Sequence, residues 1–168
     1  MKKIILLMFL GVFFISLSDT EYEESPKYAM KIMYGEGYKS TLQNILFDWT
    51  SQKDPAGTTF VGISAEKYLW NDIWNGSLDI TAQLGLIRHL ENGNQDDFFQ
   101  YNAGIKFIWK KFPWSKYVRT KLYALEGMSY VDKIPYLEKE NLDFEGKPHS
   151  YLLNYLEFGL AFNLKELP

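Results

Sequence analysis

Three features are scarce or absent in this sequence, and each absence excludes a class of protein. The chain has no cysteine among its 168 residues, which excludes disulfide bonds and thiolate chemistry. Its formal net charge of −3 provides no basic field, so we expect no nucleic-acid partner. Its longest apolar run, residues 4–15, is too short for a transmembrane helix. In contrast, aromatic residues are abundant and make up 17% of the chain.

The first eighteen residues have the pattern of a secretory signal peptide. Lys2 and Lys3 form a charged start, residues 4–15 form the apolar segment, and Ser16-Leu17-Ser18 offers small residues for cleavage. The alternative interpretation is an N-terminal membrane anchor. We expect export, cleavage after residue 18, and a single β-barrel domain over residues 19–168.

The clearest structural signal is the segment from Ser77 to Leu86, in which apolar and polar residues alternate strictly. Period two indicates an extended strand with one apolar and one polar face. About ten residues also suffice to cross a bilayer as a tilted strand. The segment is therefore predicted to be a membrane-spanning strand.

Six strands of this kind are predicted, and turn-rich segments separate them. They are residues 28–34, 59–70, 77–86, 99–109, 117–131 and 151–164. Gly35 and Gly37 are expected to break or bulge the first strand, and a bulge is expected near Glu126 and Gly127. The connections alternate between long and short, and outer-membrane barrels likewise have short periplasmic turns and longer outer loops.

These features predict an all-β fold, an antiparallel up-and-down outer-membrane β-barrel. A soluble lipocalin-like barrel is the alternative, but its polarity would be reversed, with an apolar interior. The polar faces of the predicted strands carry charges of both signs, which favours a polar interior where they can pair. Six strands are fewer than the usual minimum of about eight. We therefore expect either a chain that is incomplete at its C-terminus or closure by another route, such as self-association.

Charged residues of the predicted interior are expected to form a structural ion-pair network. They are Glu66, Asp79, Arg119, Lys121 and Glu157. The alternative is a site that handles protons or binds a polar ligand.

Five aromatic residues gather near the predicted short turns. They are Trp70, Trp74, Trp109, Trp114 and Tyr117. Tyrosine and tryptophan prefer the membrane interface, so we interpret them as an aromatic belt on the periplasmic side.

Candidate catalytic residues are few. The two histidines are His89 and His149, and His149 directly precedes Ser150. Adjacent residues on a strand point to opposite faces, so this pair could act as base and nucleophile only in a loop. His89 is expected in solvent or at the membrane interface. No cofactor motif or metal-ligand spacing is found, and we assign no catalytic, cofactor-binding or metal-binding residue.

Two stretches carry a family resemblance. They are Ala124–Val131, ALEGMSYV, and Leu152–Phe158, LLNYLEF. Together with the barrel layout, they resemble the acyloxyacyl-hydrolase-like outer-membrane proteins, whose characterised relatives are lipid A 3-O-deacylases. The resemblance implies a barrel of about eight strands in a Gram-negative outer membrane. It also implies that lipid A, or another outer-membrane lipid, is the partner.

The resemblance further implies hydrolysis of an ester-linked acyl chain of lipopolysaccharide. Family members use a His-x-Ser pair and a later Glu, on strands that follow the one matching Tyr151–Leu164. No residue of this chain matches those positions, and Glu157 is not taken as the catalytic Glu. The chain is therefore predicted to be a truncated or inactive member. The alternatives are a non-catalytic structural or adhesive barrel and, more weakly, a soluble periplasmic carrier.

Overall fold

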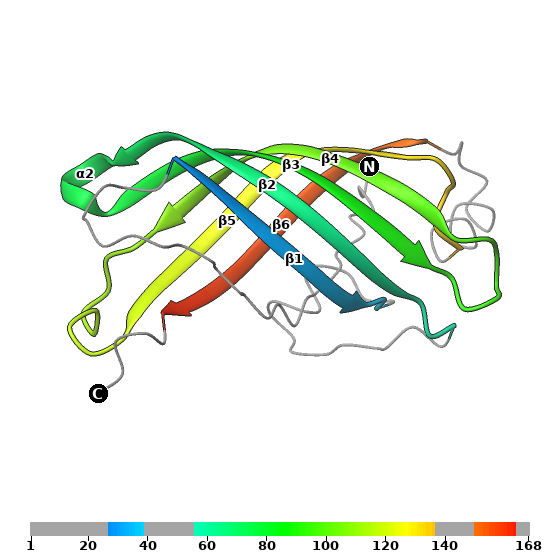
Figure 1. Ribbon diagram of the computed structural model, residues 1–168, viewed down its shortest axis with the longest axis horizontal. Helices are drawn as coiled ribbons and strands as arrows, with labels where there is room; N and C mark the ends of the chain where they lie inside the picture. The colour runs from blue at the N-terminus through cyan, green and yellow to red at the C-terminus, as the bar shows by residue number, and fades with distance from the viewer. Residues whose placement is uncertain (1–26, 39–55, 137–149, 164–168) are drawn as a thin grey trace, which may run out of the picture.

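One antiparallel sheet of six strands makes up the computed structural model of this chain (Figure 1). The structure describes residues 27–38, 56–136 and 150–163. Its strands are β1 (Tyr28–Glu36), β2 (Thr59–Asp72), β3 (Leu78–Leu90), β4 (Phe98–Trp109), β5 (Arg119–Val131) and β6 (Leu152–Asn163). A four-residue helical element, α2 (Ile73–Gly76), joins β2 to β3. Among the described residues, no helix is long and apolar enough to cross a membrane.

Each strand pairs with the next one in the sequence, so the sheet order is β1-β2-β3-β4-β5-β6. All five pairings are antiparallel. The sheet curls into a half-barrel, and β1 passes in front of β6 in the view of Figure 1. The predicted all-β, up-and-down arrangement is confirmed, and so is each of the six predicted strands. The predicted signal peptide lies outside the described residues.

The sheet buries a polar face and exposes an apolar one. On β3, Thr81 and Gln83 are buried, whereas Leu84 is 67% exposed. Among the described residues, 16 polar or charged side chains are buried against 9 hydrophobic ones, while 26 large hydrophobic side chains are exposed. This polarity is the reverse of that of a protein folded in water. We call the polar concave side the inner face and the apolar side the outer face. The polar inner and apolar outer faces that period two predicts are confirmed on β2, β3, β4 and β6.

Apolar side chains close the inner face at the end where β2 begins and β3 ends. One cluster there consists of Met33, Phe60 and Ile87. A second consists of Phe98, Val131 and Ile134, with Leu153 packed against it. The ion pairs of the inner face described below lie at its middle and at its opposite end.

Two predictions that were based on glycine positions differ from the structure. β1 is not broken at Gly35 but ends at Glu36, directly before Gly37, and at Gly35 the ring of Phe60 occupies the space where a side chain would lie. The bulge expected near Gly127 is wrong, since the pairing of β4 with β5 is continuous from Gln100 to Trp109. A register shift occurs instead in β2, between Tyr68 and Trp70.

The short turns lie at the other end of the sheet. The tight turn predicted at Asn71–Gly76 is confirmed, and three of its non-glycine residues have left-handed backbones: Asp72, Trp74 and Asn75. The fifth strand begins at Arg119 rather than at Tyr117. Strict alternation along this strand would put Thr120 on the outer face with Leu122. Thr120 is instead buried, and the indole N–H of Trp114 donates to its Oγ1 at 2.9 Å.

Candidate functional site

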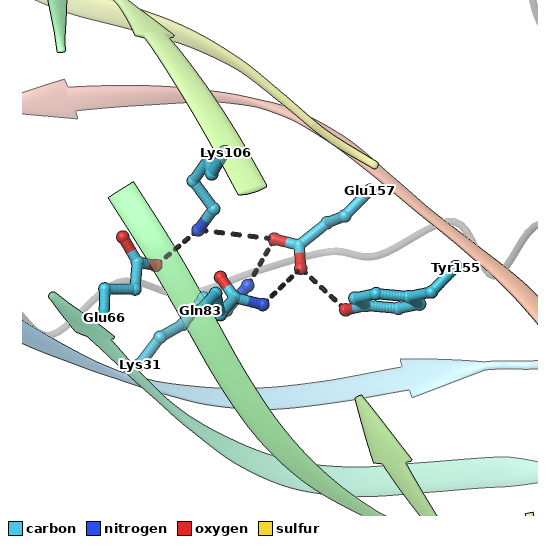
Figure 2. Close-up of polar contacts among 6 residues, drawn as sticks. All are labelled: Lys31, Glu66, Gln83, Lys106, Tyr155 and Glu157. Carbon is cyan, nitrogen blue, oxygen red and sulfur yellow. Dashed lines mark hydrogen bonds and ion pairs between the residues drawn. The ribbon is translucent and has the colours of Figure 1, made fainter. Parts of the chain in front are cut away.

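A polar cluster occupies the middle of the inner face and is built from both edges of the sheet inward (Figure 2). We call it the central cluster. Its members are Lys31 of β1, Glu66 of β2, Gln83 of β3, Lys106 of β4, and Tyr155 and Glu157 of β6. Residues at alternate positions of a strand share a face, which places Tyr155 and Glu157 together. The cluster therefore joins strands that the sheet does not pair directly.

Both oxygens of the Glu157 carboxylate are engaged. Oε1 accepts a hydrogen bond from Lys31 Nζ. Oε2 accepts one from the hydroxyl of Tyr155 at 2.7 Å and one from Gln83 Nε2 at 3.2 Å. Lys106 Nζ lies 4.0 Å from Oε1. These donors compensate the cost of burying the carboxylate, which is only 8% exposed.

Lys106 connects the two carboxylates of the central cluster. Its Nζ donates to Glu66 Oε1. The same ammonium lies 4.8 Å from the ring centroid of Tyr123 on β5, and Lys31 Nζ lies 5.9 Å from it. Two lysines thus face two glutamates in a region with little exposure to solvent. The formal charges cancel, as a buried ionic network requires.

A second group of charges lies at the end with the short turns. Lys110 Nζ is 2.6 Å from Asp79 Oδ1 and 2.8 Å from Asp72 Oδ1. The backbone N–H of Asp72 also donates to Asp79 Oδ1, at 2.9 Å. Partial burial alone would lower the pKa of Lys110, but the hydrogen bonds and charges of Asp72 and Asp79 outweigh it and raise that pKa above its usual value. Lys110 therefore stays charged and neutralises the buried Asp79.

The predicted network is found only in part. Glu66 and Glu157 meet in the central cluster, as expected, whereas Asp79 belongs to the group at the short turns. Arg119 and Lys121 lie at the start of β5 and are exposed. The positive charge of Lys121 nevertheless interacts electrostatically with Asp79 and Glu66.

Lys31 was not among the predicted members, although a sequence signal for it exists. In β1 it stands between exposed apolar residues, with Met30 at 74% and Ile32 at 72%, while Lys31 itself is 4% exposed. Period two would have placed it on the inner face. The same alternation would have placed Tyr155 on the inner face, two residues before Glu157.

The expectation that His89 lies in solvent or at an interface is wrong. Its side chain is 2% exposed, its Nε2 lies 2.7 Å from Gln100 Oε1, and its ring stacks on Phe98 with centroids 4.4 Å apart. The reason is that β3 continues past Leu86 to Leu90, so the inward positions continue to residue 89. His149 lies outside the described residues, and the Ser150 hydroxyl donates to the carbonyl of Leu152 at 2.8 Å.

The chemistry available in these clusters is ionic and hydrogen-bonding. Within residues 27–38, 56–136 and 150–163, no three His, Cys, Asp or Glu side chains gather as a metal ion would need. No protein-family model, curated protein or solved structure matches this chain. The resemblance to lipid A deacylases accordingly stays a prediction.

Proposed function

We propose that this chain is an outer-membrane β-barrel protein of a Gram-negative bacterium, exported by its signal peptide and held in the membrane by its outer face. The single observation that carries the proposal is the reversed polarity of the sheet. A run of large hydrophobic side chains on every strand is exposed, while lysines, glutamates and amides are buried. In water such an apolar surface would drive aggregation, whereas in lipid it is the favourable arrangement.

The soluble carrier is less well supported by the same observation. A carrier of apolar ligands needs an apolar interior, but the middle of this interior holds Lys31, Lys106 and Glu157 in direct contact. Burying these charges is tolerable because they pair with one another. The inner face therefore has no apolar space at its centre for a lipid-like ligand.

The aromatic residues provide independent support. Four tryptophans and Tyr117 lie at the end of the sheet with the short turns, and all are exposed, from 37% for Trp109 to 78% for Tyr117. An indole or phenol ring can lie with one side in lipid and the other in water. We propose that this end marks the periplasmic interface of the membrane.

We further propose that the barrel is non-catalytic, although it resembles lipid A deacylases in layout. The Glu157 carboxylate makes contacts with two lysines, a glutamine and a tyrosine, so it is engaged in the structure rather than poised as a base. Lipid A, or another outer-membrane lipid, would then contact the outer face as solvent and not as substrate.

Cell fractionation and lipid analysis test this function together. Cells that make the full chain should contain it in the outer-membrane fraction, and their lipid A mass spectra should be identical to those of cells without it. Recovery in the soluble periplasm would contradict the membrane proposal. Loss of an ester-linked acyl chain only in cells that make the protein would contradict the non-catalytic proposal and identify a deacylase.

A charge placed on the outer face tests the membrane contact directly. Ala103 is exposed in the middle of β4, so Ala103→Arg creates no steric clash with the sheet. In lipid vesicles we expect the free energy of unfolding to fall by about 2–4 kcal/mol, because arginine near the bilayer centre is costly. Asn71→Arg, at an exposed position beside the short turn after β2, is the matched control and should change it by less than about 1 kcal/mol, because charge is tolerated near the interface. Equal effects at the two positions would show that the outer face is not in lipid.

A further inference from the structure

The two edges of the sheet approach each other without pairing. Among the described residues, β1 has only β2 as a neighbour and β6 has only β5. No Cα atom of β1 lies within 8 Å of a Cα atom of β6. Paired antiparallel strands bring opposite Cα atoms to about 4.5–5.5 Å. Lys31 and Glu157 nevertheless form an ion pair from these two edges, through the interior. The edges therefore face a gap that side chains bridge but the backbone does not.

An open edge is costly in the setting proposed above. The outward N–H and C=O groups of β1, from Ala29 to Gly35, and those of β6 make no hydrogen bond to a neighbouring strand within the described residues. In hydrocarbon, each unsatisfied backbone group costs several kcal/mol, so a sheet in a membrane must close. A partner that supplies a matching edge would remove this cost.

Strand direction and side-chain charge indicate which partner fits. Because six strands alternate in direction, β1 and β6 run in opposite directions. The β6 edge of one chain can thus pair with the β1 edge of another in the antiparallel manner of every other pair in the sheet. The two edges also carry opposite charges on the inner face, Lys31 on β1 and Glu157 on β6. The chain is therefore complementary to itself.

We propose that a second copy of this chain closes the barrel, with β6 of each copy pairing with β1 of the other. This inference rests on the proposed membrane location. Two six-stranded sheets give a ring of twelve strands, an even number, as bacterial barrels have. The ion pair between Lys31 and Glu157 re-forms between the copies, so exchange keeps this contact and adds the backbone hydrogen bonds of two strand pairs.

Single cysteines report this pairing, because the natural chain contains no cysteine. Setting Lys31 opposite Glu157 places Met30 opposite Phe158, and both side chains are exposed on the outer face, at 74% and 41%. Two differently tagged chains, Met30→Cys and Phe158→Cys, are co-expressed and treated in the membrane with a short bis-maleimide. A control pair combines Met30→Cys with Leu84→Cys, which is exposed in the middle of β3.

The mixed dimer should form at least about tenfold more with Phe158→Cys than with Leu84→Cys, because strand pairing holds the two thiols at a high effective concentration. A chain with both Met30→Cys and Phe158→Cys that links only to itself would overturn the proposal in favour of closure within one chain. Absence of both products in membrane-inserted protein would overturn it as well. Protein found only in the soluble fraction would instead contradict the membrane location.

Discussion

Replacing Glu157 by leucine is expected to lower the free energy of unfolding by about 3–5 kcal/mol. The carboxylate accepts hydrogen bonds from Lys31, Gln83 and Tyr155 and lies 4.0 Å from Lys106 Nζ. Its removal leaves two buried lysines with Glu66 as their acidic partner. An uncompensated buried charge costs more than the ion pair itself contributes, which is why the effect should be large. Urea unfolding in vesicles, followed by tryptophan fluorescence, measures it.

Glu126→Leu is the matched control for this substitution. Glu126 lies on the outer face of β5, opposite Ile105 and Leu156, and is exposed. In lipid its replacement by leucine should not lower the stability, since a carboxylate is unfavourable there. If Glu157→Leu costs no more than Glu126→Leu, the central cluster does not hold the strands together.

A double variant separates the charge from the loss of packing. Lys31→Met combined with Glu157→Leu removes one cation together with one anion, leaving Lys106 paired with Glu66. Replacing a buried ion pair by apolar residues is often close to neutral. We therefore expect the double variant to be more stable than Glu157→Leu alone, with a coupling energy of about 1–3 kcal/mol. Strictly additive losses would indicate that Lys31 and Glu157 do not interact.

Gly127→Ala is expected to destabilise the sheet by about 3 kcal/mol or more, at the upper end of the range for overpacking. At this point β5 approaches β4 so closely that a Cβ atom would lie 2.5 Å from Gly104 Cα and 2.9 Å from the carbonyl carbon of Ala103. Those neighbours are backbone atoms of a paired strand and can move only if the ladder between Gly104 and Gly127 opens. Unfolding in urea again provides the measurement.

Gly85→Ala provides the comparison for this prediction. Gly85 lies on the inner face of β3, where a Cβ atom would meet Ser64 Cβ at 3.5 Å and Asn102 Cβ at 3.6 Å. These are ordinary van der Waals distances, so alanine should be tolerated within about 1 kcal/mol. Equal losses at Gly85 and Gly127 would mean that glycine acts through chain flexibility rather than through close contact of the strands.

The sequence does not show that alanine would be tolerated at Gly85 but not at Gly127. Both stand in predicted strands, and a bulge is predicted near Glu126 and Gly127, where the alternation becomes unclear. In the structure the pairing is continuous at Gly127. Gly127 lies directly opposite Gly104, and the two strands pack closely there. Whether a glycine marks an irregularity or a close approach depends on the residue across the ladder, which a single segment does not specify.

His89 illustrates the same limit at a strand end. The strict alternation from Ser77 ends at Leu86, so the sequence places His89 at a strand end near the outer loop. The strand continues to Leu90, and the side chain of His89 points inward and stacks on Phe98 of β4. Pairing with a neighbouring strand, rather than local composition, sets the length of a strand.

The sequence by itself determined which side chains share a face, because period two is a property of the extended backbone and needs no partner. It therefore predicted the six strands, the apolar outer face and the inward position of Glu66, Asp79 and Glu157. Only the tertiary structure decided which of the inward charges meet. Lys31 and Glu157 are 126 residues apart and lie on strands that are not paired. Their contact depends on how far the whole sheet curls. That curvature is the sum of the twist and bend contributed by every strand, so no single strand segment specifies it.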